Sequence, residues 1–226
     1  MSVKVFAIIV AGGSGSRMNS EEPKQFISLM GKPIIIHTLD AFRKANPDIH
    51  LIVVLPDAHM NFGMNLLQLN GYATGVQFAR GGDTRFHSVK NGLDLVTADS
   101  IVLVHDAVRC LLSHELISKC ILKAEKEESA IPVIMSRDSI RQITNTGSRN
   151  LTRQEIRIVQ TPQAFNSVLL KESFQQAYQD TFTDEASVVQ YAGHSIQLIE
   201  GEEENIKITF PMDLIVAERL LSQREV

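Results

Sequence analysis

The sequence predicts an α/β protein whose mostly parallel sheet is covered by helices on both faces. Three observations lead to this fold class. Short β-branched runs alternate with stretches that carry apolar residues at spacings of three and four, which is typical of repeated βαβ units. The apolar runs are nearly continuous, as in strands buried on both faces. One later stretch breaks this rhythm with two extended segments around a polar turn, and we expect it to project as a β-arm.

The first part of the chain supplies most of the predicted sheet. Buried strands are expected at the apolar runs 4–10, 50–55, 76–79, 101–105 and 130–135. Helices are expected between them, at 33–45, 57–69, 84–96 and 113–127. Pro33 suits the first position of a helix, and Ser113 suits an N-cap.

The second part begins with the predicted arm. Extended segments at 137–144 and 150–159 flank Asn145-Thr146-Gly147-Ser148, a composition typical of a hairpin turn. Helices at 167–178 and 183–192, a strand at 195–199 and a helix at 211–222 follow. No repeat or composition break divides the chain. We therefore expect residues 1–226 to form a single domain with an arm at about 137–159.

The composition is that of an ordinary globular protein. The chain has 226 residues, of which 44% are hydrophobic and 21% are charged, so a disordered or fibrous protein is excluded. Its longest apolar run is too short to span a bilayer, no export signal is visible, and the two cysteines form no disulfide framework. We expect a cytoplasmic protein without membrane contact. The net charge of −4 argues against a nucleic-acid partner.

A glycine-rich loop directly after the first strand is the strongest local sign of function. It reads Ala11-Gly12-Gly13-Ser14-Gly15-Ser16-Arg17-Met18. Glycines at a strand end let backbone N–H groups approach a phosphate closely. The loop is neither a Walker A motif nor a dinucleotide fingerprint, because Met18 stands where a third glycine belongs. With Arg17 and Lys24 as cations, the segment favours a triphosphate site over a plain tight turn.

A second glycine pair, Gly81-Gly82, precedes the helix predicted at 84–96. This arrangement would place Ser88 and backbone N–H groups near a ligand. A plain strand–turn–helix connection with Asp83 as the N-cap explains the same residues equally well.

A carboxylate, Asp106, follows the hydrophobic strand predicted at 101–105. Open α/β sheets bind ligands at the carboxyl ends of their strands. Near a triphosphate site, Asp106 is the candidate ligand for Mg²⁺, which prefers oxygen donors, and the alternative is a helix cap. His105 is expected in the core. The sequence contains no zinc motif and no serine-hydrolase elbow.

In their order along the chain, these segments resemble the 2-C-methyl-D-erythritol 4-phosphate cytidylyltransferase family. The resemblance extends from about residue 5 to 220 and rests on an ordered set of motifs, none of which is specific alone. The set comprises 11–18, 23–25, 31–33, 81–89, 105–109, 138–139, 161–163, 183–187 and 205–209. It implies a Rossmann-like nucleotidyltransferase fold, a homodimer joined through β-arms, and Mg²⁺-dependent transfer of CMP from CTP to a polyol phosphate.

The resemblance also implies roles for matched residues. The residues that would wrap the CTP phosphates are Ala11, Gly12, Gly13, Gly15 and Arg17. Cytosine and ribose would be contacted by Gly82, Asp83 and Ser88. Arg17 and Lys24 would stabilise the transition state, and Asp106 would hold the metal. The acceptor phosphate would be positioned by Lys207 and Arg153, for which Arg157 is a competitor. Further substrate contacts are expected from Ala107, Arg109, Ser139, Thr161 and Thr183.

Ser139 stands where the family usually has threonine, a change that keeps the hydroxyl. Cys110 replaces a usual proline, and Phe210 follows Thr209 where the family tolerates variety. Neither of these last two departures touches a phosphate-binding residue.

Two alternatives to this activity stay open at this point. A ribitol-5-phosphate cytidylyltransferase shares the donor half of the site, although the segment 183–187 favours the erythritol phosphate. The other alternative is a non-catalytic nucleotide-binding module on the same fold. The joint presence of Arg17, Lys24, Asp106 and Lys207 argues against it.

Overall fold

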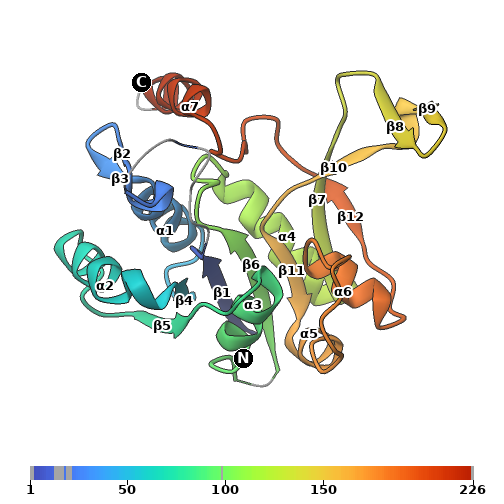
Figure 1. The fold of residues 1–226 in the computed structure, drawn as a ribbon. Coiled ribbons are helices and arrows are strands. Elements are labelled where there is room, and N and C mark those ends of the chain that lie inside the picture. The colour runs from blue at the N-terminus through green and yellow to red at the C-terminus, as the bar shows by residue number, and fades with distance from the viewer. Residues whose placement is uncertain (1–2, 13–17, 19–21, 98, 225–226) are drawn as a thin grey trace.

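The computed structural model describes residues 3–12, 18, 22–97 and 99–224, and within them the largest sheet has eight strands (Figure 1). Four of these strands are parallel neighbours, in the order β6 (Ser100–Asp106), β1 (Lys4–Val10), β4 (His50–Leu55) and β5 (Val76–Arg80). All four were predicted from their apolar runs. The mostly parallel sheet is therefore confirmed.

The other half of the sheet is mixed. The predicted strand β7 (Ser129–Met135) is separated from β6 by a short antiparallel strand, β11 (Gln163–Asn166). The later part of β7 pairs antiparallel with β10 (Arg157–Val159), and β12 (Leu198–Glu200) pairs parallel with β7. β10 and β11 were not predicted as sheet strands, and the strand expected at 195–199 begins at Leu198.

Helices cover both faces of the sheet, as predicted. Along β1, Ala7 and Ile9 belong to a core shared with α1 (Ile34–Ala45), α2 (Met60–Leu69) and α4 (His114–Glu127). Phe6 and Ile8 belong to the core of the opposite face, with α3 (Arg85–Leu93), α5 (Ser167–Ser173) and α6 (Glu185–Tyr191). A third cluster lies under α7 (Pro211–Arg224). None of these helices in the described part of the chain is long and apolar enough to cross a membrane.

Several predicted helix boundaries were wrong by a few residues. Pro33 is the N-cap of α1 rather than its first helical residue. Thr84, not Asp83, caps α3 by accepting a hydrogen bond from the backbone of His87. α3 ends at Leu93 because the chain turns back there and buries Val96. The helix predicted at 57–69 begins as a 3-10 turn, η3 (Asp57–His59).

The helices predicted at 167–178 and 183–192 are also shorter than expected. α5 ends at Ser173, after which Phe174 is buried and stacks on Phe86. The second, α6, begins after Asp184, whose side chain accepts from the backbone of Ser187 in a capping box.

The arm is a separate two-stranded antiparallel sheet, which projects from the body at the upper right of Figure 1. Its strands are β8 (Ile140–Thr144) and β9 (Gly147–Leu151). Gly147 pairs with Thr144, so the turn is tighter than the predicted four residues. The segment expected to be extended over 150–159 is instead interrupted by the 3-10 turn η4 (Arg153–Glu155) and returns to the main sheet as β10.

Candidate active site

Two cavities open at the carboxyl ends of β1 and β6. The first has a volume of about 270 Å³ and the second about 240 Å³. Both are lined by Arg85, Asp106 and Lys207, so the cavities meet at one charged cluster. Cavities at this edge of an open α/β sheet are where such folds bind ligands.

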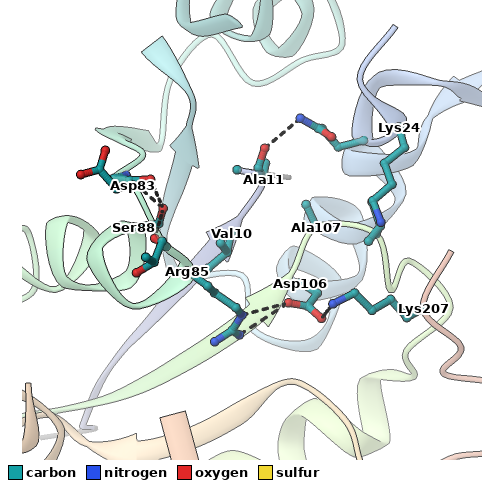
Figure 2. Close-up of a pocket in the computed structure, with 14 residues that line it drawn as sticks. Val10, Ala11, Lys24, Asp83, Arg85, Ser88, Asp106, Ala107 and Lys207 are labelled. Atoms are coloured by element: carbon teal, nitrogen blue, oxygen red, sulfur yellow. Dashed lines mark hydrogen bonds and ion pairs between the residues drawn. The ribbon is translucent and has the colours of Figure 1, made fainter. Parts of the chain in front are cut away.

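The first cavity lies between the glycine loops predicted to bind a nucleotide. Ala11 and Gly12 line it directly after β1. Asp83 and Ser88 lie together at one side (Figure 2). Its other lining residues are Val10, Lys24, Gln25, Gly82, Thr84, Ala107 and Val108. The structure therefore brings together nine predicted site residues: Ala11, Gly12, Lys24, Gly82, Asp83, Ser88, Asp106, Ala107 and Lys207.

The close approach of the loop before α3 to the first turn of that helix requires glycine at position 82. A Cβ there would lie 2.4 Å from the Cβ of His87 and 3.0 Å from its carbonyl carbon. Ser88 fixes the loop, because its Oγ accepts from Gly82 N at 3.0 Å and donates to Thr84 O at 3.0 Å. The backbone of this loop is thus held in place beside the cavity.

Lys24 enters the first cavity from the 3-10 turn η2 (Lys24–Phe26). The residue is buried, and its Nζ donates to the carbonyl of Ile208 at 3.1 Å. The next side chain, Gln25, donates to Ala11 O at 2.8 Å and joins this turn to the end of β1. Lys24 and Lys207 lie on the side of the cavity opposite Asp83 (Figure 2).

Asp106 is the centre of the charged cluster. Its Oδ2 lies 2.8 Å from Lys207 Nζ and 3.6 Å from Arg109 Nε, and its Oδ1 lies 3.5 Å from Arg85 Nε. Burial alone would raise the pKa of Asp106, but Arg85, Lys207 and Arg109 hold that pKa below its usual range. The carboxylate is therefore ionised at neutral pH.

The second cavity contains three more predicted residues: Arg109, Thr161 and Thr183. Thr161 Oγ1 accepts from the backbone N–H of Asp106 at 3.1 Å and lies 3.0 Å from His105 Nδ1. Burial lowers the pKa of His105 to about 3, with Asp106 opposing the shift, so this core histidine is neutral. Arg109 donates to the carbonyl of Asn205 at 2.8 Å, which orients its guanidinium along the cavity wall.

Two predicted residues that the structure describes, and the competitor of one of them, line neither cavity. Ser139 and Arg153 are exposed at the base of the arm, and Arg153 donates to the carbonyl of Arg137. Its competitor Arg157 is exposed too and donates to nearby carbonyls. Gly13, Gly15 and Arg17 lie outside the described residues, so their roles stay predictions.

Sequence reasoning missed a pair of residues in this site, Arg85 and Glu185. Both nitrogens at the end of Arg85 donate to the Glu185 carboxylate, with Nη2 at 3.0 Å from Oε2. Each residue belongs to a quoted motif, but no spacing rule relates positions 100 residues apart. The one sign of this pair in the sequence was that a charged residue begins each of two helices, Arg85 in α3 and Glu185 in α6.

The donor set of this cluster fits Mg²⁺ only with a phosphate ligand beside it. Among the described residues there is no group of three or more histidine, cysteine or acidic side chains able to hold a metal. Mg²⁺ usually takes one or two carboxylates together with substrate phosphates and water. Asp106 lines both cavities and therefore fits as a single protein ligand.

The fold and the site define the chain as an α/β protein of the nucleotidyltransferase class, with cationic side chains gathered at the strand ends. The model of the 2-C-methyl-D-erythritol 4-phosphate cytidylyltransferase (IspD) family matches residues 5–223, and the chain belongs to this family.

Curated relatives and solved structures agree with this family. A 2-C-methyl-D-erythritol 4-phosphate cytidylyltransferase of Bacteroides fragilis is 46% identical over 215 residues, which cover 95% of this chain and 98% of the relative. The 4-diphosphocytidyl-2C-methyl-D-erythritol synthase of Anaerococcus prevotii superposes with a TM-score of 0.83 at 27% identity, covering 97% of this chain and 96% of that one. The Thermus thermophilus cytidylyltransferase gives a TM-score of 0.75 at 30% identity, covering 98% and 100%.

Proposed function

We propose that this chain transfers the cytidylyl group of CTP to 2-C-methyl-D-erythritol 4-phosphate. The products are 4-diphosphocytidyl-2-C-methyl-D-erythritol and pyrophosphate, in non-mevalonate isoprenoid biosynthesis. The observation that supports this most directly is the pair of cavities that meet at Asp106, Arg85 and Lys207 in a chain of this family. A two-substrate transfer needs such adjoining sites, one for the donor and one for the acceptor.

The reaction joins two anions, so neutralisation and positioning are the main tasks of the protein. An oxygen of the acceptor phosphate forms a bond to the α-phosphorus while the bond to the pyrophosphate oxygen breaks. Lys24 and Lys207 place ammonium groups in the first cavity, where charge develops on the phosphoryl oxygens. No general base is required, because a phosphate monoester is already anionic near neutral pH.

We assign the first cavity to CTP and the second to the acceptor. Backbone groups at Gly12 and Gly82, with Ser88 beside them, suit a nucleotide, and Arg109, Thr161 and Lys207 suit a polyol phosphate. Asp106 would hold Mg²⁺ together with the CTP phosphates. When bound, the ion supplies positive charge to those phosphates.

The proposal includes a homodimer in which the arm reaches a second subunit. A two-stranded hairpin is at best marginally stable alone in water, and Ile143 on this arm is 79% exposed. Residues at the base of the arm, Ser139 and Arg153, would then serve the partner's acceptor cavity. We also propose that the protein acts in the cytoplasm.

A substrate panel tests the proposed activity. Purified protein with Mg²⁺ and CTP is expected to release pyrophosphate rapidly with 2-C-methyl-D-erythritol 4-phosphate and slowly with ribitol 5-phosphate. ATP and GTP are expected to be poor donors, because a pocket sized for a pyrimidine excludes the larger ring. Faster turnover with ribitol 5-phosphate would move the acceptor assignment to that sugar alcohol. No release with either acceptor would contradict the proposal.

A further inference from the structure

Arg85 bridges two carboxylates that belong to different parts of the fold. Its terminal nitrogens donate to both oxygens of Glu185, at the start of α6, and its Nε lies 3.5 Å from Oδ1 of Asp106, at the end of β6. The Glu185 side chain is 1% exposed, and that of Asp106 is 11% exposed. Bidentate pairing of this kind fixes the plane of a guanidinium as well as its position.

Glu185 is held rigidly, although it lines neither cavity. α6 is capped by Asp184 and Ser187, and Gln163 of β11 accepts from the backbone of Ala186 and donates to Asp184. Burying the Glu185 carboxylate costs free energy. Among the described side chains, only Arg85 offsets this cost by forming an ion pair with it. Burial raises the pKa of Glu185, and Arg85 opposes that rise.

The ion pair with Glu185 fixes the orientation of the Arg85 guanidinium. Arg85 lines both cavities, at the place where the two substrates would meet. With Glu185 in place, its terminal N–H groups are occupied, and only one edge of the guanidinium faces Asp106. Without Glu185, those N–H groups would be free to bind a substrate phosphate or to take Asp106 away from Lys207.

We propose that Glu185 is a positioning residue, which holds Arg85 in the wall between the two cavities and thereby fixes Asp106 for the transfer step. This inference rests on the proposed function. Its consequence is that Glu185 affects turnover only through Arg85. Loss of Glu185 disturbs the alignment of the reacting groups more than the binding of CTP, because Glu185 lies on α6 and itself lines neither cavity.

The test compares three variants with the wild-type enzyme: Glu185→Gln, Arg85→Gln and the double variant. Glu185→Gln keeps the shape of the side chain and removes its charge. It is expected to lower kcat by about tenfold or more, with KM for CTP changed by less than about twofold. The double variant is expected to match Arg85→Gln alone, because the two residues act as one unit. Glu127→Gln, which removes the exposed pair with Lys123 on α4, is the matched control and should leave kcat unchanged.

The outcomes show whether Glu185 positions Arg85 for the reaction or not. Wild-type kcat in a folded Glu185→Gln variant, or independent losses that multiply in the double variant, would overturn the positioning role. If Glu185→Gln does not fold, the double variant decides, because it leaves no unpaired buried charge. A folded double variant with wild-type kcat then overturns the proposal, and a slow one with an unchanged KM for CTP supports it. An inactive wild-type enzyme would instead contradict the proposed function, and this inference with it.

Discussion

At the scale of single residues, the site is organised by one carboxylate among three cations. Asp106 sits at the carboxyl end of β6, where its backbone N–H also donates to Thr161. Three cationic side chains converge on it: Lys207, Arg85 and Arg109. Because Asp106, Arg85 and Lys207 line both cavities, this carboxylate stands where the two cavities meet.

Lys24 provides the most direct residue-scale prediction for catalysis. Lys24→Ala is expected to lower kcat by about 10² or more, because it removes a cation placed where charge grows in the transition state. Steady-state kinetics would measure the loss, and the melting temperature would confirm the fold. Lys44→Ala, an exposed substitution on α1, is the control. A Lys24→Ala variant that keeps most of its kcat would remove Lys24 from the catalytic machinery.

The two cysteines provide a residue-scale prediction about the core. Burial raises the pKa of both Cys110 and Cys120 to about 12. The thiolate is the reactive form, so neither thiol should react appreciably with a disulfide reagent at neutral pH while the protein is folded. Both should react quickly in denaturant. Rapid stoichiometric labelling of the native protein would show that these side chains are accessible.

At the scale of elements, the connection between β5 and α3 lines one side of the first cavity. Gly82→Ala is expected to raise KM for CTP by roughly tenfold or more, because the added Cβ would lie 2.4 Å from the Cβ of His87 and the loop must shift. CTP titrations with folded protein would measure this change.

The neighbouring glycine is the matched control for this prediction. A Cβ at Gly81 would find its nearest neighbour, Leu55 O, at 3.4 Å, which is an ordinary contact. Gly81→Ala should therefore leave KM for CTP close to the wild-type value. Equal effects of the two substitutions would mean that the close approach at position 82 is not what shapes the cavity.

The parallel strands of the main sheet and the arm hairpin could be predicted from the sequence, but the short antiparallel strands β10 and β11 could not. β1, β4 and β6 are nearly continuous apolar runs, which is typical of strands buried on both faces. β10 and β11 have three and four residues, and β11 begins with a buried polar residue, Gln163, whose role depends on α6. Both strands pair with β7, but the local sequence pattern of a strand does not show which strand it will pair with. For the same reason, the sequence did not reveal the contact between Arg85 and Glu185.

At the scale of the whole molecule, the arm carries those predicted residues of the described part of the chain that line neither cavity. Ser139 and Arg153 lie at the base of a hairpin that projects from the body (Figure 1). The glycine loop and the end of β6 could be recognised from the sequence because each follows a strand directly. In the proposed homodimer, the position of the arm residues relative to a site would depend on a second subunit, which a sequence pattern does not place.

Subunit mixing tests whether sites are shared. Lys24→Ala and Arg153→Ala homodimers are each expected to be nearly inactive. A random mixture should recover up to about a quarter of wild-type sites, because half of the dimers are mixed and each contains one intact site. Sedimentation would verify the dimer, and mass spectrometry of tagged subunits would verify exchange. An active monomer, or no recovery after verified exchange, would contradict a shared site.

We expect the protein to join a nucleotide to a sugar-alcohol phosphate across its two adjoining cavities. Phosphorus NMR of the complete reaction tests this directly, because transfer and hydrolysis give different products. With CTP, Mg²⁺ and 2-C-methyl-D-erythritol 4-phosphate, the acceptor monoester signal should disappear while the signals of a diphosphate diester and of pyrophosphate appear. Formation of CMP and pyrophosphate with the acceptor signal unchanged, or no consumption of CTP, would contradict it.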